Sequence, residues 1–267
     1  MSEEADGIGV DGIGVDGIET AAGEQAPLSR PAFYAARPGR WRDWWTLLHP
    51  PYTAWHLSYV VIGAALAPRV EISRLVASVL AFFLAVGVAA HALDELHGRP
   101  LATNIPGAQL VGAVVVGLAG AVTLGVLGTQ RVGWVLVPFI VVGAAVVVGY
   151  NLELFGGVVH NDAGFAASWG AFPVLTGYVA ESGHLSVGAG LAALGAFALS
   201  VAQRHLSSEA RLVRRRSMRV TGTVTLFDGS TLPIDRASLL APIEGALAAM
   251  SWAIVLLAAG LAVARLT

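Results

Sequence analysis

The densest group of chemically active side chains begins at His91. His91, Asp94, Glu95, His97 and Arg99 supply two imidazoles, two carboxylates and a guanidinium within nine residues. On a continuous helix, the first three of these fall at positions i, i+3 and i+4 and share one face. This density of ionisable groups exceeds what packing requires, so the stretch is a candidate catalytic site.

A second polar group follows at Tyr150, Asn151 and Glu153, and continues at His160 and Asp162. The expected topology, described below, places this group on the same face of the molecule as the first. We therefore interpret Tyr150, Asn151, Glu153, His160 and Asp162 as candidate substrate-binding residues.

Four carboxylates, those of Asp94, Glu95, Glu153 and Asp162, are expected to converge on one cavity. They would repel one another unless cations joined them, and carboxylate oxygens suit Mg²⁺. We expect Asp94, Glu95 and Asp162 to be the metal ligands. The neighbouring histidines also leave Zn²⁺, Mn²⁺ or Fe²⁺ open. The alternative is that these groups pair internally, for example His91 with Glu95, and cap helix ends.

The composition explains where such groups must lie. The chain has 267 residues, of which 55% are hydrophobic and only 13% are charged, whereas soluble domains carry about 25% charged residues. The missing charge indicates a surface that faces lipid. The chain has no cysteine and no lysine, which excludes disulfides, thiolate metal sites and lysine Schiff-base chemistry. Nothing in the sequence indicates a nucleic-acid partner.

Seven stretches are long and apolar enough to be candidate membrane-spanning helices. The sequence therefore predicts an all-α polytopic membrane protein with about seven spans. Pro173 predicts a broken or tilted fifth helix. The predicted spans are Tyr52–Pro68, Ser73–Leu93, Gly107–Leu127, Gly133–Tyr150, Phe165–Ala180, Leu185–Ala202 and Leu239–Ala264.

The arginines predict the orientation, because basic residues gather on the cytoplasmic side of a membrane. With the N-terminus inside, seven spans put twelve of the 16 arginines inside and four outside. We therefore expect an integral protein of the cell membrane with a cytoplasmic N-terminus. Both polar groups would then lie at the cytoplasmic face.

Five segments are expected along the chain. Residues 1–29 should be a disordered acidic tail, since residues 1–27 hold seven acidic and no basic side chains. Residues 30–51 should lie at the interface, with Trp41, Trp44 and Trp45 at headgroup level. Residues 52–202 should form a six-helix membrane core. Residues 203–238 should be a basic cytoplasmic insertion with a β-hairpin around Asp228-Gly229, and residues 239–267 the final span.

Four further side chains are weighed as parts of a cavity. His56 and Tyr59 share a face of the first span and are candidate substrate-binding residues. Trp169 is a candidate pocket wall, as is Phe172, although packing is the competing interpretation for both. Small residues on the third span, Gly117 and Gly125 among them, predict close approach of helices.

In three stretches that include both polar groups, the sequence resembles the UbiA superfamily of intramembrane prenyltransferases. Trp45-Thr-Leu-Leu-His-Pro-Pro-Tyr-Thr looks like the entry to that family's first helix. His91-Ala-Leu-Asp94-Glu95-Leu-His-Gly-Arg99-Pro-Leu is similar to its first aspartate-rich motif. The stretch from Tyr150-Asn151 through Trp169-Gly-Ala-Phe-Pro resembles its tyrosine-containing loop and the following helix. Together these cover roughly residues 45–205.

The resemblance implies a UbiA-like helical bundle whose site opens to the cytoplasm and holds a prenyl diphosphate through Mg²⁺. We expect His91, Asp94, Glu95 and Arg99 to be the catalytic residues: Asp94 matches the family's motif directly, His91 and Glu95 are candidate substitutes for its other acidic positions, and Arg99 is suited to phosphate. The chain departs from the family in three ways. Of the first motif, NDxxDxxxD, only Asp94 carries over directly. No DxxxD follows the sixth span, where the sequence reads Gln203-Arg-His-Leu-Ser-Ser-Glu209. The family usually has nine helices.

Three functions are compatible with these residues. The first is a divergent UbiA-type enzyme that ionises a prenyl diphosphate or related lipid with metal assistance, leading to transfer or cyclisation. The second is a membrane metalloenzyme of another reaction class. The third is a non-catalytic lipid-binding or scaffold protein. The expected partner in the first and third is a membrane lipid or isoprenoid.

Overall fold

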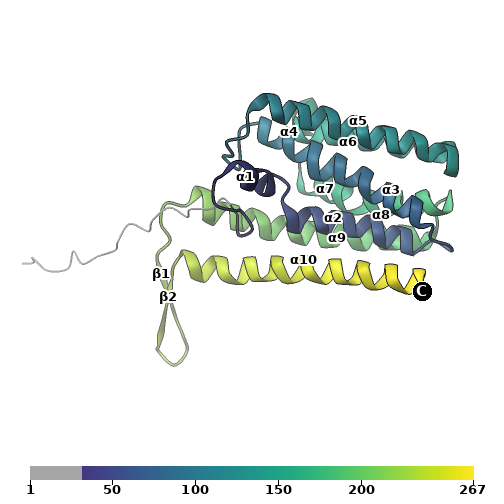
Figure 1. Ribbon diagram of the computed structural model, residues 1–267. Coiled ribbons are helices and arrows are strands. Elements are labelled where there is room, and N and C mark those ends of the chain that lie inside the picture. The colour runs from purple at the N-terminus through teal and green to yellow at the C-terminus, as the bar shows by residue number, and fades with distance from the viewer. Residues whose placement is uncertain (1–31) are drawn as a thin grey trace, which may run out of the picture.

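The computed structural model describes residues 32–267 and shows helices lying side by side in one bundle (Figure 1). Residues 1–29, the expected acidic tail, lie outside the described residues. The end of the bundle that carries α1 also carries the hairpin, and we call it the polar end. The elements in chain order are α1 (Arg40–Leu47), α2 (Pro50–Ala65), α3 (Ile72–Phe82), the π-helix η1 (Phe83–Ala90), α4 (His91–Leu96), α5 (Gly107–Val132), η2 (Trp134–Leu136), α6 (Val137–Asn151), η3 (Leu154–Gly157), α7 (Asp162–Ala166), the π-helix η4 (Ala167–Ala171), α8 (Phe172–Ser182), α9 (Val187–Arg211), the π-helix η5 (Leu212–Arg216), β1 (Gly222–Thr225), β2 (Thr231–Ile234) and α10 (Arg236–Leu266).

Within residues 32–267, five helices are long and apolar enough to cross a membrane. The prediction of an all-α membrane protein with a small hairpin is confirmed at this level. Two other predicted spans are also helical: α2 has 16 residues, and α7, η4 and α8 follow one another without a break. The five helices are Ile72–Leu96, Gly107–Val132, Trp134–Asn151, Val187–Arg216 and Arg236–Leu266.

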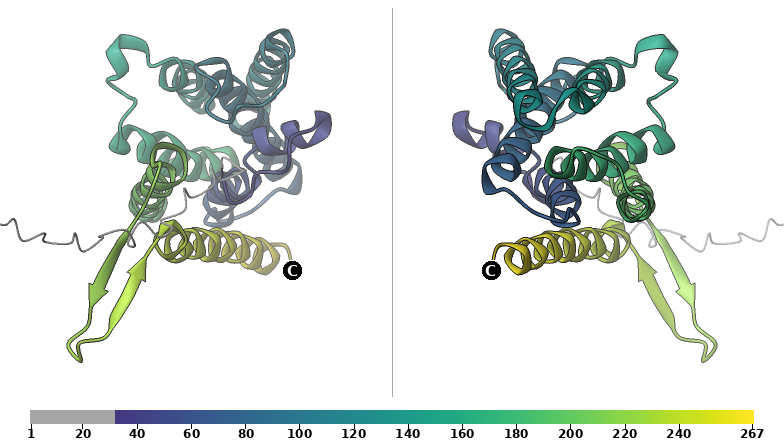
Figure 2. Two further views of the ribbon diagram at one scale, coloured as in Figure 1. Left: turned by 90° about the vertical axis from the view of Figure 1, so that its left-hand side faces the viewer. Right: turned by 90° about the vertical axis from the view of Figure 1, so that its right-hand side faces the viewer.

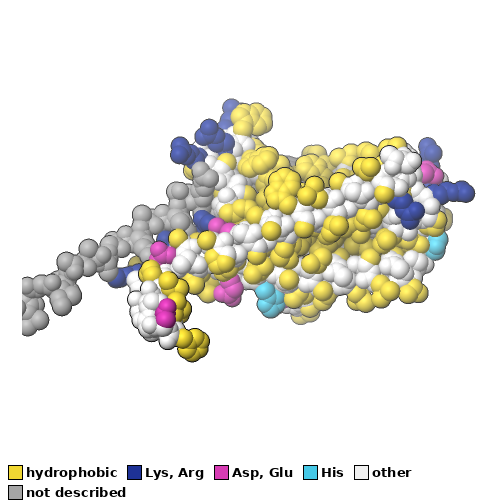
Figure 3. All heavy atoms as spheres, turned by 90° about the horizontal axis from the view of Figure 1, so that it is seen from below, with side chains coloured by type: hydrophobic (Ala, Val, Ile, Leu, Met, Phe, Trp, Pro, Cys, Tyr) yellow, Lys and Arg dark blue, Asp and Glu magenta, His cyan; other side chains and the backbone are white. Residues whose placement is uncertain are grey.

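The surface of the bundle is that of a protein in lipid. On α5 only Leu110 and Gly117 are buried, and valines such as Val115 and Val116 are exposed. Figure 3 shows apolar side chains covering the length of the helices, with charged side chains gathered at the two ends. An apolar surface this extensive is stable only against lipid, because soluble proteins rarely expose patches above a few hundred Å².

The helices begin and end where the sequence supplies caps. The Asn161 and Ser186 side chains accept hydrogen bonds from the backbone N–H groups of Gly164 and Ala189 at the starts of α7 and α9. Asp235 and Ser238 form a reciprocal capping box at the start of α10. Gly133, with a φ of 101°, ends α5.

Helices α2 and α8 pack closely along the centre of the bundle, and α10 packs on the other side of α2. Two glycines permit this approach. A Cβ on Gly63 would lie 2.0 Å from the carbonyl oxygen of Val174, and a Cβ on Gly177 would lie 2.2 Å from that of Val60. On α5, a Cβ on Gly117 would lie 2.7 Å from the Leu84 carbonyl oxygen. The sequence thus correctly indicated close approach at Gly117 but missed the tighter α2–α8 contact.

The fifth helical run continues through Pro173 without the predicted break, but its hydrogen-bond pattern changes there. The π-helix η4 immediately precedes α8, in which Pro173 stands at the second position. Proline has no N–H, so it cannot donate to the carbonyl of Trp169 four residues earlier. The ring of His56 replaces it, with Nδ1 2.8 Å from the Trp169 carbonyl oxygen. His56 therefore stabilises the π-helical segment just before Pro173.

The segment between the last two long helices is shorter than residues 203–238. Helix α9 runs to Arg211 and η5 continues it to Arg216, so only residues 217–235 lie outside helices. The expected hairpin is present, with β1 and β2 antiparallel and Val224 opposite Leu232. The basic residues around Arg214 were assigned to a soluble insertion because the apolar run ends near Ala202. The helix nevertheless continues with a polar face.

Candidate functional site

A polar cavity of about 480 Å³ lies among α2, η1, α4, α9 and the loop after α6. It joins segments far apart in sequence, from Tyr34 before α1 to Glu244 on α10. The cavity lies at the ends of several helices. Side chains that are too polar to face lipid can meet there inside the bundle. Seven of the predicted site residues line it: His56, His91, Asp94, Tyr150, Asn151, His160 and Trp169.

Glu95 and Arg99 do not line this cavity, contrary to their predicted catalytic role. Glu95 is completely buried and accepts hydrogen bonds from Leu101 N at 3.0 Å and from Thr103 N and Oγ1 at 2.8 Å. Arg99 Nη1 donates to the carbonyl oxygen of Ile105 at 2.7 Å. Their positions follow from the turn after α4, in which Gly98 and Arg99 both have positive φ. This pair holds the loop between α4 and α5.

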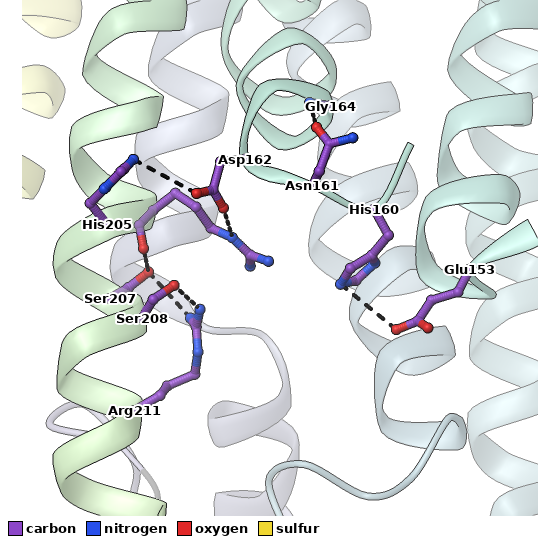
Figure 4. A network of polar contacts seen from close by, with 10 residues as sticks. Glu153, His160, Asn161, Asp162, Gly164, His205, Ser207, Ser208 and Arg211 are labelled. Atoms are coloured by element: carbon purple, nitrogen blue, oxygen red, sulfur yellow. Dashed lines mark hydrogen bonds and ion pairs between the residues drawn. The ribbon is translucent and has the colours of Figure 1, made fainter. Parts of the chain in front are cut away.

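Glu153 and Asp162 also lie outside the lining of the polar cavity, and they do not meet each other (Figure 4). Glu153 lies 3.8 Å from His160 Nε2. Asp162 lies 3.2 Å from Arg204 Nε and 3.7 Å from His205 Nε2. Both carboxylates are half exposed on loops or at a helix start. The predicted convergence of four carboxylates is therefore wrong.

Tyr59 is likewise not part of the cavity wall. It is buried against Trp55 in the core, and its hydroxyl accepts a hydrogen bond from Ser200 Oγ at 3.4 Å. Tyr59 and His56 are three residues apart on α2, but the helix turns Tyr59 towards α9 and the centre of the bundle. Phe172 packs on Phe139 with ring centroids 5.9 Å apart.

Asp94 is the one member of the predicted carboxylate set that reaches the cavity. It makes no hydrogen bond or ion pair with any residue in 32–267. In this part of the chain, no group of three His, Asp or Glu side chains lies close enough to hold a metal ion. The residues present therefore do not fit the magnesium–diphosphate cage that the resemblance implies, nor a transition-metal centre.

The cavity instead gathers arginines, which the sequence interpretation had assigned elsewhere. Arg204, Arg211, Arg214, Arg215 and Arg216 all line it, together with Gln203 and Ser207. All lie on α9 or its continuation η5, and positions 203, 207, 211 and 214 among them recur at helical spacing on one face. That spacing was a usable signal, and it was missed because the segment was interpreted as a soluble insertion.

Arg211 differs from its neighbours in what it contacts. Arg204 pairs with Asp162, and Arg214 pairs with Glu244, with Nε 2.9 Å from the carboxylate. Arg211 donates to two hydroxyls of its own helix, Ser207 Oγ at 3.2 Å and Ser208 Oγ at 2.8 Å (Figure 4). No carboxylate within the described chain lies at ion-pair distance from it. The cavity therefore has positive charge to offer a ligand.

Stacked rings form the rest of the wall. The His49 and His91 rings lie 4.4 Å apart and nearly parallel, and Tyr34 Oη is 2.7 Å from His49 Nδ1. The Tyr150 ring stacks on His160 at 4.5 Å. Burial, and after it the charges of His91, Arg215 and Arg211, holds the pKa of His49 well below its ordinary value. His49 is therefore neutral in the folded protein at pH 7.

Three buried polar atoms in this wall have no hydrogen-bond partner among the described residues. They are His49 Nε2, the Tyr150 hydroxyl and Gln203 Oε1. Buried polar groups in native proteins are nearly always hydrogen-bonded to protein or water. The three atoms are themselves buried, so within the described chain they are unpaired polar groups inside the wall rather than groups exposed to the cavity.

A second cavity, also of about 480 Å³, has a different lining. It lies among α3, α5, α6 and α8, and its walls are mostly Ala, Val, Leu and Phe, with Arg74 and Arg131 at the end away from α1. Val86 and Trp169 line both cavities. These two side chains therefore form a wall shared by the polar and apolar cavities.

The fold and the site define an integral membrane protein of the α-helical bundle class, with a polar cavity at one end and an apolar cavity beside it. No family model, no curated protein and no solved structure matches the chain. What the chain does must therefore be argued from its own residues.

Proposed function

We propose that this protein binds an amphiphile whose head carries phosphate or diphosphate. The head occupies the polar cavity, and the hydrocarbon chain passes Val86 and Trp169 into the apolar cavity. The observation that carries the proposal is Arg211, a cavity arginine that contacts two hydroxyls and, within residues 32–267, no carboxylate. A guanidinium in such a place is suited to bidentate contact with phosphate oxygens.

The balance of charge in the cavity supports an anionic head. Five arginines line it, against the carboxylates of Asp94 and Glu244, and Glu244 is paired with Arg214. Arg204 is paired with Asp162 from outside the lining. Among the described residues, Arg211 contacts hydroxyls and no carboxylate, so it keeps a positive charge that a phosphate or diphosphate would neutralise.

The resemblance adds a substrate class and a reaction, namely a prenyl diphosphate that is transferred or cyclised. In that reaction the allylic C–O bond breaks and its electron pair leaves with diphosphate. The cavity arginines would stabilise the departing charge. The faces of Trp169 and Tyr150 would shield the carbocation. Because the carboxylates do not fit a magnesium cage, we derive no step through a metal ion.

We further propose that α2 and the α7–α8 run cross the membrane, giving seven spans, and that the polar end faces the cytoplasm. Both helices lie alongside the five long apolar helices (Figure 1). Twelve of the 16 arginines then lie on the cytoplasmic side. The headgroup cavity would open to the leaflet from which cytoplasmic substrates arrive.

The experiment compares the purified protein with Arg211→Ala and with Arg69→Ala, an exposed arginine at the opposite end. Lipids that co-purify are identified by mass spectrometry, and binding of a prenyl diphosphate is measured with EDTA present. Wild type and Arg69→Ala should bind the phosphate-bearing lipid. Arg211→Ala should bind at least tenfold more weakly, since a charged hydrogen bond contributes about 1.5–3 kcal/mol. Equal binding by all three proteins would refute the proposal.

A second candidate function is lipid binding without turnover. Glu95 and Arg99 favour it, because both are committed to the loop after α4 and leave Asp94 as the one carboxylate of the resembling motif in the cavity. Turnover assays with radiolabelled prenyl diphosphates separate the two candidates. Release of diphosphate favours the enzyme, whereas recovery of intact bound lipid favours the binding protein.

A further inference from the structure

The β1–β2 hairpin has one apolar and one polar face. Val224 pairs with Leu232, and Thr223 with Pro233. Side chains alternate between the two faces of a strand, so Val224, Leu232 and Ile234 share one face, and Thr223, Thr225 and Thr231 share the other. Both residues of the Val224–Leu232 pair are exposed, and Phe227 in the turn is fully exposed. An apolar face left open on a two-stranded hairpin requires a covering surface.

The direction of the hairpin points to the membrane as that surface. Figure 1 shows the hairpin leaving the polar end across the direction of α10, and Figure 2, viewed along the bundle, shows it extending beyond the edge of the helices. It therefore runs parallel to the plane of the membrane. Figure 3 shows apolar side chains on the side of the hairpin turned towards the helices. Its apolar face is thus turned towards the lipid.

The depth of the hairpin also fits. Helix α10 has 31 residues, which at 1.5 Å each is about 46 Å, whereas the hydrocarbon core is about 30 Å thick. The first turns of α10 therefore stand at the level of the lipid headgroups. The hairpin joins α10 directly, since β2 ends at Ile234 and the helix begins at Arg236.

The charges beside the hairpin are those that attract an anionic headgroup. Arg216 at the end of η5 and Arg219 before β1 are exposed, and Met218 between them is 85% exposed. The opposing charge at the tip is Asp228, whose carboxylate accepts hydrogen bonds from Ser230 N at 2.9 Å and Ser230 Oγ at 2.6 Å. Its charge is thus held within the turn.

We propose that the hairpin docks with its apolar face on the anionic lipid surface of the same membrane that the helices span. Phe227, Val224 and Leu232 enter the headgroup layer, and Arg216 and Arg219 contact lipid phosphates. Docking fixes the end of α9 relative to the start of α10, the two helices that carry Arg211 and Glu244. The proposal does not depend on what the polar cavity binds.

The chain has no cysteine, so a single introduced cysteine is labelled uniquely. Nitroxide labels at Val224→Cys, Phe227→Cys and Leu232→Cys are compared with matched labels on the polar face at Thr223→Cys, Thr225→Cys and Thr231→Cys. The full chain is reconstituted in nanodiscs containing phosphatidylglycerol. Oxygen should enhance the relaxation of the apolar-face labels several-fold more than a water-soluble nickel chelate does. For the polar-face labels the nickel chelate should have the larger effect.

Three outcomes would overturn the proposal. Labels on both faces open to the nickel chelate would show a hairpin in water. Apolar-face labels shielded from both reagents would show a protein partner. Spin–spin broadening that grows with protein density would show a second copy. Replacing Arg216 and Arg219 with Ala should lower the equilibrium constant for docking by about fivefold for each arginine. Exchanging phosphatidylglycerol for phosphatidylcholine should lower it in the same way. No change in either case would remove the anionic surface from the proposal.

Discussion

At the residue scale, Asp94 puts a negative charge into a cavity lined mainly by positive ones. If the arginines bind phosphate directly, that charge repels the ligand. Asp94→Asn is then expected to tighten binding of a prenyl diphosphate in EDTA by about fivefold, from the roughly 1 kcal/mol between two charges a few ångströms apart in water. Equilibrium binding of the labelled diphosphate measures the change.

The control for this variant is His97→Gln, an exposed position directly after α4 that should leave binding unchanged. A loss of binding in Asp94→Asn, together with a magnesium requirement in the wild type, would make Asp94 a metal ligand after all.

His56 and Pro173 form a pair whose coupling is measurable. His56→Leu leaves the buried carbonyl of Trp169 without the donor that replaces the missing N–H of residue 173, and should cost about 1–3 kcal/mol of stability. Pro173→Ala supplies an N–H, so the double variant should lose less than His56→Leu alone. Thermal unfolding of the four proteins in detergent gives the coupling. Strictly additive losses would mean that the two residues act independently.

His49 gives the fold a pH dependence of known sign. Its pKa in the folded protein is held, mainly by burial, below the ordinary value of 6.5, so the unfolded chain binds the proton more readily. This contribution to stability is complete above about pH 6.5 and falls as the pH drops below it, by up to about 1.4 kcal/mol per pH unit. His49→Gln should therefore show a smaller drop in melting temperature between pH 7.5 and pH 5.0. An equal drop would mean that His49 is protonated without cost.

At the element scale, the contact between α2 and α8 depends on glycine. A methyl group on Gly63 or Gly177 would overlap a carbonyl oxygen of the facing helix, so Gly63→Ala and Gly177→Ala should each cost at least about 1–3 kcal/mol. Gly112→Ala on α5, where a Cβ meets open space, is the matched control and should be neutral or slightly stabilising. Melting temperatures in detergent provide the comparison. Three equal values would show that α2 and α8 separate readily.

The sequence predicted these elements better than it predicted their contacts. Apolar runs and the Asp228-Gly229 turn are local signals, and both appear in the structure as expected, whereas the helix continues through Pro173. The roles of the polar side chains were harder to predict. A buried carboxylate such as Glu95 can accept hydrogen bonds from a loop just as readily as it can bind a ligand. Its role depended on the positive φ angles at Gly98 and Arg99, which turn Leu101 and Thr103 back onto it.

At the scale of the whole molecule, the two cavities and the hairpin make the two ends of the bundle different. Arginines and stacked rings lie at the polar end, whereas the apolar cavity extends towards Arg74 and Arg131 at the other end. An amphiphile bound as proposed would be aligned with the lipids around it, its head at the same level as their heads. The membrane would then orient the ligand before it enters the protein.

That arrangement requires α2 and the α7–α8 run to cross the membrane, and single cysteines in this cysteine-free chain test it. Arg37→Cys and Asn161→Cys lie before these helices, and Arg69→Cys and Leu185→Cys lie after them. An impermeant maleimide added to intact cells should label positions 69 and 185 and spare positions 37 and 161, which should react only in inverted vesicles. A cysteine at position 267 should also label in intact cells, like positions 69 and 185, because seven spans from a cytoplasmic N-terminus put the C-terminus outside. Labelling of positions 37 and 69 from the same side would show that α2 does not cross. The polar cavity would then lie beside the membrane surface rather than within a seven-helix bundle.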